Sequence, residues 1–356
     1  MLGVNLMIVN RKRIYYLDIL RVIACMAVVM IHASSGYVTK DFGGFNFWVG
    51  NVFDSFARIG VPLFVMISGS IMLDKDYSYN NKLIKHIVKL IIFFIFWSAL
   101  YDIVYNIMVP LFITHEPINI LKIIGNFFKG HFHLWFIYMI IGMYLILPLL
   151  RLWVKDENKK YVEYFIILAI VFTFIVPQII NIGSNYSSIF EYIQKIIDCI
   201  NMNYVGGFTT YFILGWYINN YDIKNKKVLY TLGFVSALVT IIGTGILSIT
   251  TGQPIQLYGD ITINVLLYSV MIFVLVKNRY KKENNHENKL ISIISKNSLG
   301  IYAMHPVIIA SISIILESIN MNVAIINIPI TYILAFVISF IGTYIFSKIS
   351  ILKNVV

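Results

Sequence analysis

Long apolar stretches separated by short polar segments follow one another along almost the whole chain. About 20 apolar residues are needed to carry an α-helix across a bilayer, and nine of the stretches approach or exceed that length, while the sixth is shorter. The pattern predicts an all-α fold, a polytopic transmembrane helix bundle of about ten spans, forming a single domain over residues 1–356 with no separate soluble domain. The predicted spans are Ile14–Gly36, Phe47–Leu73, Ile87–Phe112, His131–Leu150, Tyr161–Ile180, Gly206–Asn219, Val228–Ile249, Ile261–Val276, Ser298–Leu316 and Val323–Phe346.

The basic residues indicate which side of the membrane each connection faces. If ten helices alternate in direction, 21 of the 28 Lys and Arg residues lie in segments on the N-terminal side and only four lie on the other side. Lys and Arg accumulate in cytoplasmic connections. The distribution therefore predicts that the N- and C-termini are both cytoplasmic. The first stretch follows Arg11-Lys12-Arg13 and resembles a signal peptide, but it is too long and contains charges, so we expect a retained helix.

Three connecting segments differ from the rest. Ile113–Gly130 and Asn181–Val205, both predicted to lie outside, combine polar and apolar residues at near-helical spacing, which is typical of interfacial or re-entrant helices. Lys277–Lys289, predicted to lie inside, is polar and expected to be mobile. Of the two cysteines, Cys25 is expected in the core and Cys199 in a loop, with no disulfide between them.

Composition narrows the class of protein. The chain is 59% apolar and 13% charged, which excludes a disordered chain and an ordinary soluble enzyme. A net charge of +11 would normally raise the possibility of nucleic acid as a partner. Because the basic residues lie in short gaps between apolar stretches, no nucleic-acid partner is expected, and the lipid bilayer is the partner that the pattern requires.

Ionisable residues inside the predicted spans are the candidate functional residues, since such groups are costly in lipid and usually face a cavity or a partner. Asp18 and Arg21 are spaced to pair on one helix surface. His32 follows Arg21 by eleven residues, three helical turns plus about 20°, so the two project from one face about 16 Å apart. A structural alternative is a snorkelling Asp18–Arg21 pair at one interface and a histidine near the other.

The second span also contains charges. Asp54 and Arg58 have a favourable i, i+4 spacing. Pro62 lies between Gly60 and Gly69, so a kinked helix that packs closely on a neighbour is the structural alternative to a site.

Histidines begin the fourth span and lie within the ninth. On a helix, His131 and His133 would point to different sides, and the sequence has neither CxxC nor HExxH, so no metal site is expected. Trp135 suits the aromatic belt of a membrane protein. His305 lies inside an apolar stretch and requires a hydrogen-bond partner there, which a purely structural histidine would also need. GxSxG, P-loop and GxGxxG motifs are absent, so hydrolase, NTPase and dinucleotide-binding functions receive no support.

Several segments together resemble the integral-membrane acyltransferase 3 family. The family's first helix carries an arginine, ten residues and then a histidine, as Arg21 and His32 do here. The other similar segments occur in the family's order: Gly60–Gly69, His133–Tyr138 followed by Tyr144–Pro148, Phe212–Tyr217 and Leu299–Pro306. The resemblance covers nearly the whole chain. One departure is the stretch before the third helix, which is arginine-rich in many members but here has lysines within Lys82–Lys89.

The resemblance implies a membrane-embedded O-acyltransferase of the cell envelope, multi-pass in a bacterial plasma membrane. It would move an acyl group, acetyl by expectation, from cytoplasmic acyl-CoA to a hydroxyl of a cell-surface glycan or lipid-linked sugar. No bound cofactor is expected, because acyl-CoA is the donor substrate. His32 would be the general base or acyl-carrying nucleophile, supported by Arg21 and Asp18. The residues expected to line the substrate path are Arg58, His133, Trp135, Tyr302 and His305.

Two other functions remain open from the residues alone. A transporter would use the intramembrane charges as a substrate or proton pathway, although no inverted repeat is evident. A membrane sensor or assembly subunit would perform no chemistry. Some family members add an extracytoplasmic SGNH-type domain, and because this chain ends soon after its tenth predicted helix, such a transferase would be a separate partner protein.

Overall fold

The computed structural model describes residues 14–74, 81–200, 206–254, 257–281 and 287–356. These residues form helices and their connections, with no β-strand among them. The α-helices are α1 (Tyr15–Ser34), α2 (Phe45–Ala57), α3 (Gly60–Met72), α4 (Asn81–Asp102), α5 (Ile120–Lys129), α6 (Trp135–Trp153), α7 (Lys159–Ala169), α8 (Val176–Ser184), α9 (Ile189–Ile200), α10 (Phe208–Asn220), α11 (Lys226–Thr251), α12 (Ile263–Tyr280), α13 (Lys289–Lys296), α14 (Ser298–Ser318) and α15 (Ala324–Lys348).

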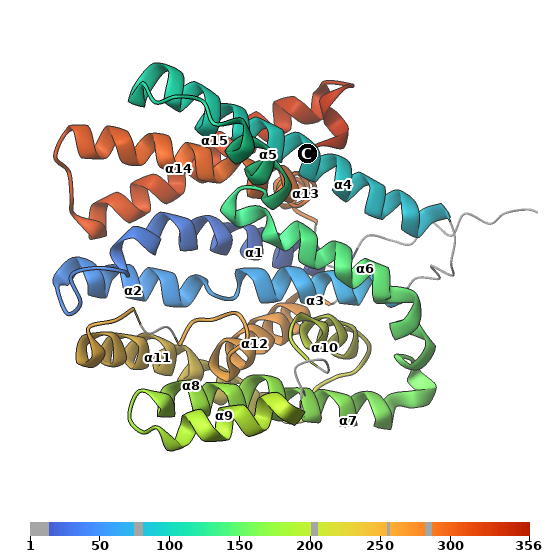
Figure 1. Ribbon diagram of the computed structural model, residues 1–356. Helices are drawn as coiled ribbons and strands as arrows, with labels where there is room; N and C mark the ends of the chain where they lie inside the picture. The colour runs from blue at the N-terminus through green and yellow to red at the C-terminus, as the bar shows by residue number, and fades with distance from the viewer. Residues whose placement is uncertain (1–13, 75–80, 201–205, 255–256, 282–286) are drawn as a thin grey trace, which may run out of the picture.

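The helices lie roughly side by side in a bundle (Figure 1). Nine helical segments of the described chain are long and apolar enough to cross a membrane. The tenth predicted span, Gly206–Asn219, is α10, a helix of 13 residues. At 1.5 Å per residue it reaches only about 20 Å, short of a hydrocarbon core. The polytopic all-α bundle predicted from the sequence is therefore confirmed, with one span shorter than a membrane is thick.

The second predicted span is two helices. α2 ends at Ala57 and α3 begins at Gly60, so Arg58 and Ile59 lie at a break in the middle. Pro62 is in the first turn of α3, where its missing N–H would have had no intrahelical partner. The proline therefore begins a helix here and does not kink one.

Short helices pack very closely at the centre of the bundle. α3 and α10 cross with Gly69 against the backbone of Phe212 and Gly215 against that of Met66. A Cβ atom at either glycine would overlap the opposing backbone. The hydroxyl of Ser70 donates to the Gly215 carbonyl across the same contact, at 2.8 Å. Small residues thus allow two helices to approach at backbone distance, as in many membrane proteins.

α1 lies at the centre, in contact with α2, α3, α12, α13, α14 and α15. Eleven of its 20 residues are buried, and Cys25 is 1% exposed, as the sequence predicted for a core residue. α1 is thus packed on several sides by other helices of the bundle. Apolar side chains on the outermost helices are exposed instead, for example Ile333 and Val337 on α15, as expected for a lipid-facing surface.

The connecting segments contain helices of their own. The predicted segments Ile113–Gly130 and Asn181–Val205 contain α5 and α9, whose apolar and polar residues lie on opposite faces. Cys199 lies on α9 and is exposed, so the expectation of a loop at this position was wrong. The near-helical spacing of its apolar neighbours had already indicated a helix. Part of Lys277–Lys289 lies in α12, and residues 282–286 and Arg11–Arg13 lie outside the described residues.

Figure 1 shows how the connections are distributed between the two ends of the bundle. The α1–α2 and α14–α15 connections lie at the left, and the α6–α7 connection lies at the right. His32, in the last turn of α1, therefore lies toward the left-hand end, and Asp18 and Arg21 lie toward the other end.

Candidate active site

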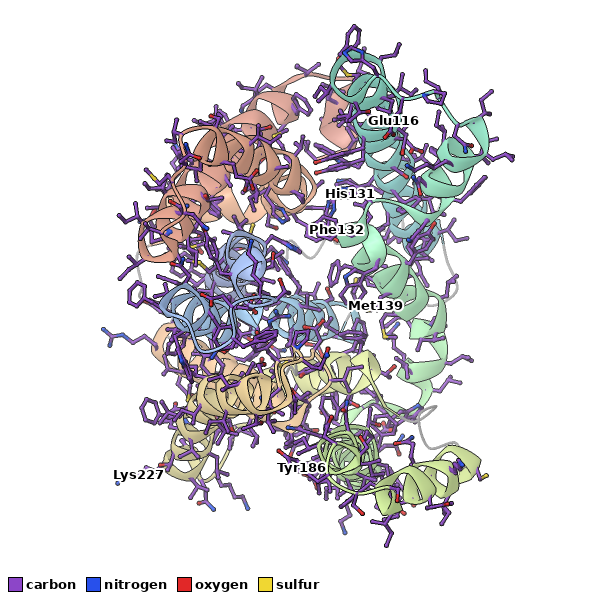
Figure 2. All side chains as sticks on the ribbon, turned by 60° about the vertical axis from the view of Figure 1, so that its left-hand side comes forward. Glu116, His131, Phe132, Met139, Tyr186 and Lys227 are labelled. Atoms are coloured by element: carbon purple, nitrogen blue, oxygen red, sulfur yellow. The ribbon has the colours of Figure 1, made fainter. Side chains whose placement is uncertain are left out.

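Four histidines from distant parts of the sequence gather at one place in the bundle. The ring of His32 on α1 stacks against that of His305 on α14, with centroids 5.1 Å apart and planes inclined by 29°. The ring of His133 lies 5.7 Å from His305, and His131 lies 5.2 Å from His133. We refer to His32, His131, His133 and His305 as the histidine cluster. Figure 2 shows His131 and Phe132 in the region between α14–α15 and α4–α5.

The connection before α6 places two of these residues. α6 begins at Trp135; His131 has an extended backbone and His133 lies in a 3-10 turn over Phe132–Leu134. Because the segment is not α-helical, the two Nδ1 atoms approach to 3.0 Å. The prediction that His131 and His133 point to different sides was therefore wrong. Among the described residues, no group of three or more His, Cys, Asp or Glu side chains is placed to hold a metal ion.

Hydrogen bonds fix the orientation of the buried rings. Nδ1 of His305 donates to the carbonyl of Ile301, 3.2 Å away on the preceding helical turn. The hydroxyl of Tyr302 donates to the carbonyl of His133, which ties α14 to the segment before α6. His133 and His305 are fully enclosed, and the Nε2 atom of each has no hydrogen-bond partner in the described part of the structure. These nitrogens are unsatisfied polar atoms at the centre of the cluster.

Aromatic rings enclose the cluster. The ring of Tyr101 on α4 stacks on His131 at 4.2 Å, and Phe132 packs edge-on against His32 at 5.2 Å. The Tyr101 hydroxyl donates to the carbonyl of Ala303 at 2.7 Å. The sequence analysis did not select Tyr101 or Tyr105, because tyrosines are common throughout this chain and only tertiary contacts distinguish these two. His131 was noticed but assigned no role, because its assumed helical geometry pointed it away from His133.

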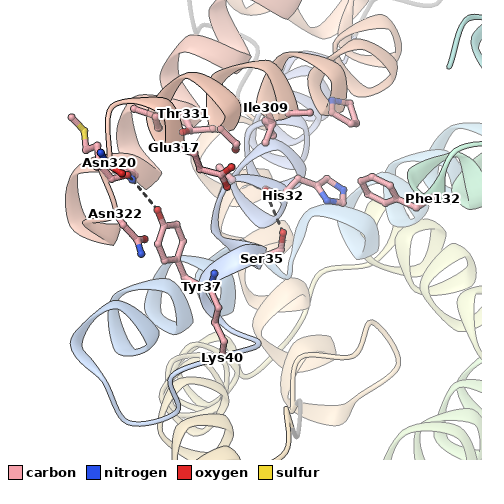
Figure 3. Close-up of a pocket in the computed structure, with 18 of the residues that line it drawn as sticks. His32, Ser35, Tyr37, Lys40, Phe132, Ile309, Glu317, Asn320, Asn322 and Thr331 are labelled. Carbon is pink, nitrogen blue, oxygen red and sulfur yellow. Dashed lines mark hydrogen bonds between the residues drawn. The ribbon is translucent and has the colours of Figure 1, made fainter. Parts of the chain in front are cut away.

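A cavity of about 700 Å³ opens from the cluster (Figure 3). His32, His131 and Phe132 lie at one part of its wall, and the rest combines apolar side chains such as Ile309 and Leu316 with charged or amide ones: Lys40, Glu317, Asn320, Asn322 and Asn327. Tyr37 and Asn327 are joined by a hydrogen bond of 3.0 Å, donated by the Asn327 amide. We call this space the histidine cavity. Its mixed polar wall suits a hydrophilic molecule that carries hydroxyl groups.

Asp18 and Arg21 form a separate cluster near the start of α1, whereas His32 lies in its last turn. Nη1 of Arg21 lies 3.5 Å from Oδ1 of Asp18, so the predicted pairing is confirmed. Ser295 on α13 joins both: its hydroxyl donates to Asp18 at 2.6 Å and accepts from Arg21 at 3.1 Å. The sequence analysis did not predict α13, and without this helix Ser295 could not be recognised as the third residue of the cluster. Eleven residues of helix separate this Arg21 cluster from His32, a rise of about 16 Å.

Arg58 lies outside the wall of the histidine cavity. At the break between α2 and α3 it forms an ion pair with the fully buried Asp54, as the spacing predicted, and its guanidinium lies over the ring of Tyr258 at 4.2 Å. The Ser34 hydroxyl, two residues beyond His32, donates to Asp54 at 3.2 Å. Burial raises the pKa of nearby Asp260 to about 6; the charge of Arg58 opposes the rise and that of Asp54 adds to it.

The remaining predicted path residues differ in position. Tyr302 is buried beside His133, with ring centroids 5.3 Å apart. Trp135 is 40% exposed and packs on Phe208, with ring centroids 5.5 Å apart, so it lies beside the cluster and not within it. His32, His133, His305 and Tyr302 are thus brought together, whereas Arg21 and Arg58 belong to two other polar clusters.

The fold and this site together define a polytopic α-helical membrane protein with a buried histidine cluster at the wall of a polar cavity. Comparison with protein families identifies it more closely: the acyltransferase 3 family, described as an acyltransferase domain, matches residues 14–348, nearly the whole chain. The chain belongs to this family and is a membrane acyltransferase. Neither the curated proteins nor the solved structures gave a match.

Proposed function

We propose that the protein transfers an acetyl group from cytoplasmic acyl-CoA to a hydroxyl of an extracytoplasmic glycan or lipid-linked sugar. The observation that carries this proposal is the position of His32, which reaches the wall of the histidine cavity while its ring stacks on the buried His305. A proton acceptor thereby lies next to a space for a hydroxyl-bearing substrate. Membership of the acyltransferase family supports group transfer in place of the transport or sensing functions.

The distribution of charge supports the orientation. The Arg21 cluster lies toward the end of the bundle at which α1 begins, and the sequence predicts this end to be cytoplasmic, where basic residues accumulate. CoA carries phosphates, which guanidinium groups bind through charge-assisted hydrogen bonds. Arg21, held by Asp18 and Ser295, would bind the donor at this end. The thioester arm would extend along α1 toward His32.

At the histidine cluster the chemistry would be acyl transfer. His32 takes the proton of the acceptor hydroxyl as its oxygen forms a bond with the thioester carbonyl carbon. The carbon–sulfur bond then breaks, and the proton returns from His32 to the departing CoA thiolate. His305 would hold the His32 ring by stacking, with its own orientation fixed by Ile301. The hydrogen bond from Tyr302 to the carbonyl of His133 would hold the segment that carries His131 and Phe132 at the cavity wall.

A covalent route uses the same residues in two steps. His32 would first attack the thioester and release CoA, and the acceptor hydroxyl would then take the acyl group from the imidazole. An acyl-histidine would accumulate when acceptor is withheld. Protein labelled from radioactive acetyl-CoA and denatured rapidly in detergent at neutral pH distinguishes the routes, because only the covalent route leaves label on His32 and acid hydrolyses an acyl-imidazole.

Inside-out vesicles from cells that express the chain test the proposed function. With radiolabelled acetyl-CoA outside the vesicles, label is expected in an alkali-labile ester on glycan recovered from the lumen. Vesicles without the chain supply the control. Label that crosses as unmodified acetyl-CoA or acetate, with no ester formed, would contradict the proposal and indicate transport.

A further inference from the structure

Two further hollows lie beyond the histidine cavity, the first next to the cavity and the second next to the first. The first, of about 300 Å³, shares Tyr105, His131 and Phe132 with the histidine cavity and is lined beyond them by Asp102, Asn106 and Asn126. We call it the Asp102 hollow. The second, of about 340 Å³, shares Asn106 with the Asp102 hollow and includes Glu116, Asn119 and Lys122 in its wall. The Asp102 hollow therefore lies between the other two spaces and shares wall residues with each of them.

The outermost hollow reaches the protein surface. Glu116, Asn119 and Lys122 are exposed. Figure 2 shows Glu116 near the outer end of the α4–α5 part and His131 on its inner side. From Glu116 at the surface, the outer hollow, the Asp102 hollow and the histidine cavity thus follow one another toward the histidine cluster.

Asp102 is a buried carboxylate that this structure leaves only half satisfied. It is 5% exposed, and its Oδ1 accepts from the amide of Asn106, which itself accepts from Asn126 at 3.2 Å. Oδ2 has no hydrogen-bond partner among the described residues. A carboxylate within a spanning segment is costly and usually marks a substrate path. The mechanism proposed above gives this group no function.

Asp102 and Asn106 lie where the type of helix changes. After Asp102 the helix continues as a π-helix over Ile103–Met108. Asn106 follows Asp102 by four residues and donates to it, and both line the hollow that Asn126 on α5 also lines. π-helical turns are rare and frequently occur at functional sites.

The walls of the Asp102 hollow suit a polyhydroxylated ligand. The carboxylate of Asp102 and the ammonium group of Lys129 lie in this wall together with the amides of Asn106 and Asn126. Such groups accept and donate hydrogen bonds to hydroxyls, and the ring of Tyr105 offers an apolar face of the kind against which sugar rings pack. Because charges of both signs line the hollow, its wall does not favour a strongly charged ligand.

We infer that the Asp102 hollow binds the second sugar ring of an oligosaccharide acceptor whose terminal ring lies in the histidine cavity. The inference rests on the proposed function, since it names the acceptor's path to the same site. A single sugar would occupy only the histidine cavity. Oligosaccharides would therefore bind more tightly than monosaccharides, with the gain depending on Asp102 and Asn126.

A length series of acceptors tests this inference. Envelope polysaccharide from source cells that lack the chain, stripped of its esters and cleaved by mild acid, supplies mono-, di- and trisaccharides. With purified wild-type protein and radiolabelled acetyl-CoA, the KM for the acceptor is expected to fall by about tenfold from mono- to disaccharide, the effect of one hydrogen bond to a charged group. Asp102→Asn and Asn126→Ala should each remove most of this fall and leave the monosaccharide KM and kcat unchanged.

The control is Asn51→Ala. Asn51 is a buried asparagine of α2 that donates to the Ile241 carbonyl at 2.8 Å, away from all three hollows. Its loss lowers stability without changing the length dependence, and retained binding of radiolabelled acetyl-CoA shows that each variant is folded. Equal length dependence in wild type, Asp102→Asn and Asn126→Ala would overturn the inference and leave the proposed function standing. Wild-type protein that esterifies no sugar would overturn both.

Discussion

The tautomer of His305 determines what the histidine cluster presents to His32. A carbonyl oxygen only accepts hydrogen bonds, so Nδ1 of His305, 3.2 Å from the Ile301 carbonyl, carries the proton. Its Nε2 is then the atom with the free electron pair. A neutral imidazole stacked on His32 stabilises the ring without adding charge. At the residue scale the arrangement suits a histidine that must take up and release a proton.

Replacement of His32 by glutamine is expected to abolish transfer. Glutamine keeps similar size and hydrogen bonding but takes up no proton near neutral pH. The rate of label transfer should fall by about 10²–10⁴-fold, the typical contribution of a general base. His115→Gln makes the same change at an exposed histidine of the described chain and should leave transfer near wild type. Substantial turnover by His32→Gln would make His32 structural and direct attention to His305 or His133.

Arg21→Lys is expected to impair the protein although the charge is kept. Arg21 contacts Asp18 and Ser295 at once, and an ammonium group cannot reproduce the planar geometry of a guanidinium. If Arg21 also binds CoA phosphate, the KM for acyl-CoA should rise by about tenfold while the KM for the acceptor stays unchanged. Arg279→Lys, at an exposed position of α12, is the matched control. An unchanged donor KM would favour a purely structural Arg21–Asp18 pair.

Asp260 should make stability depend on pH in a mildly acidic window. Burial raises its pKa in the folded protein to about 6, above the value near 3.8 of an unfolded chain. The folded state therefore binds this proton more tightly, and the stabilisation is complete below pH 4 and lost as the pH rises through 6. In detergent, the apparent melting temperature of Asp260→Asn should vary less between pH 4 and 6 than that of wild type. Identical pH dependence of the two proteins would exclude this assignment.

Interruptions of the helices position the polar residues of this protein. Arg58 lies beside Tyr258 at the break between α2 and α3, Asn106 contacts Asp102 where α4 becomes a π-helix, and the extended segment before α6 brings His131 to His133. A continuous helix in the last segment would direct the two histidines to different sides. The interruptions are tolerable in a membrane protein because neighbouring helices cover them.

The crossing of α3 and α10 should be the element most sensitive to a small increase in volume. A Cβ atom at Gly215 would overlap the backbone of Met66, so Gly215→Ala must separate two helices that have little length over which to adjust. A loss of about 1–3 kcal/mol is expected, seen as a lower apparent melting temperature in detergent. Gly142→Ala on α6, where the added methyl group meets nothing within 4 Å, should be neutral or slightly stabilising. Equal effects of the two variants would show that the crossing is looser than described.

At the scale of the whole molecule, two polar regions lie along α1. The Arg21 cluster lies toward one end of the bundle, and the histidine cluster, with the cavity and hollows that extend it, lies toward the other. The 21-to-4 distribution of basic residues between the two predicted sides follows the same axis. Such an arrangement suits an enzyme that takes its donor from one compartment and its acceptor from the other.

Cysteine labelling in intact cells tests this orientation. The background variant is Cys199→Ser, in which the one remaining cysteine, Cys25, is buried. A single cysteine then replaces either Glu157 in the α6–α7 connection or Gln253 after α11, both of which are exposed. A membrane-impermeant maleimide should label Gln253→Cys in intact cells and Glu157→Cys only after the membrane is permeabilised. The reverse result would invert the topology and place the histidine cavity on the cytoplasmic side.

The sequence alone determined the class of fold and the local ion pairs. The polytopic all-α bundle and the pairing of Asp18 with Arg21 and of Asp54 with Arg58 follow from hydrophobic length and helical spacing, which depend on residues close in sequence. The first helix was also sufficient to place His32 about three turns from Arg21. These features require no knowledge of how one helix packs on another.

Only the tertiary structure decided which histidines meet. His32, His133 and His305 lie on segments far apart in sequence, and their contacts depend on the packing of α1 against α14 and on the non-helical entry to α6. Hydrophobic periodicity does not encode such an interruption, because the apolar pattern continues through it. For the same reason the sequence could not reveal Ser295 beside Arg21 or the Asp102 hollow, where neighbouring helices supply the polar partners that the lipid cannot.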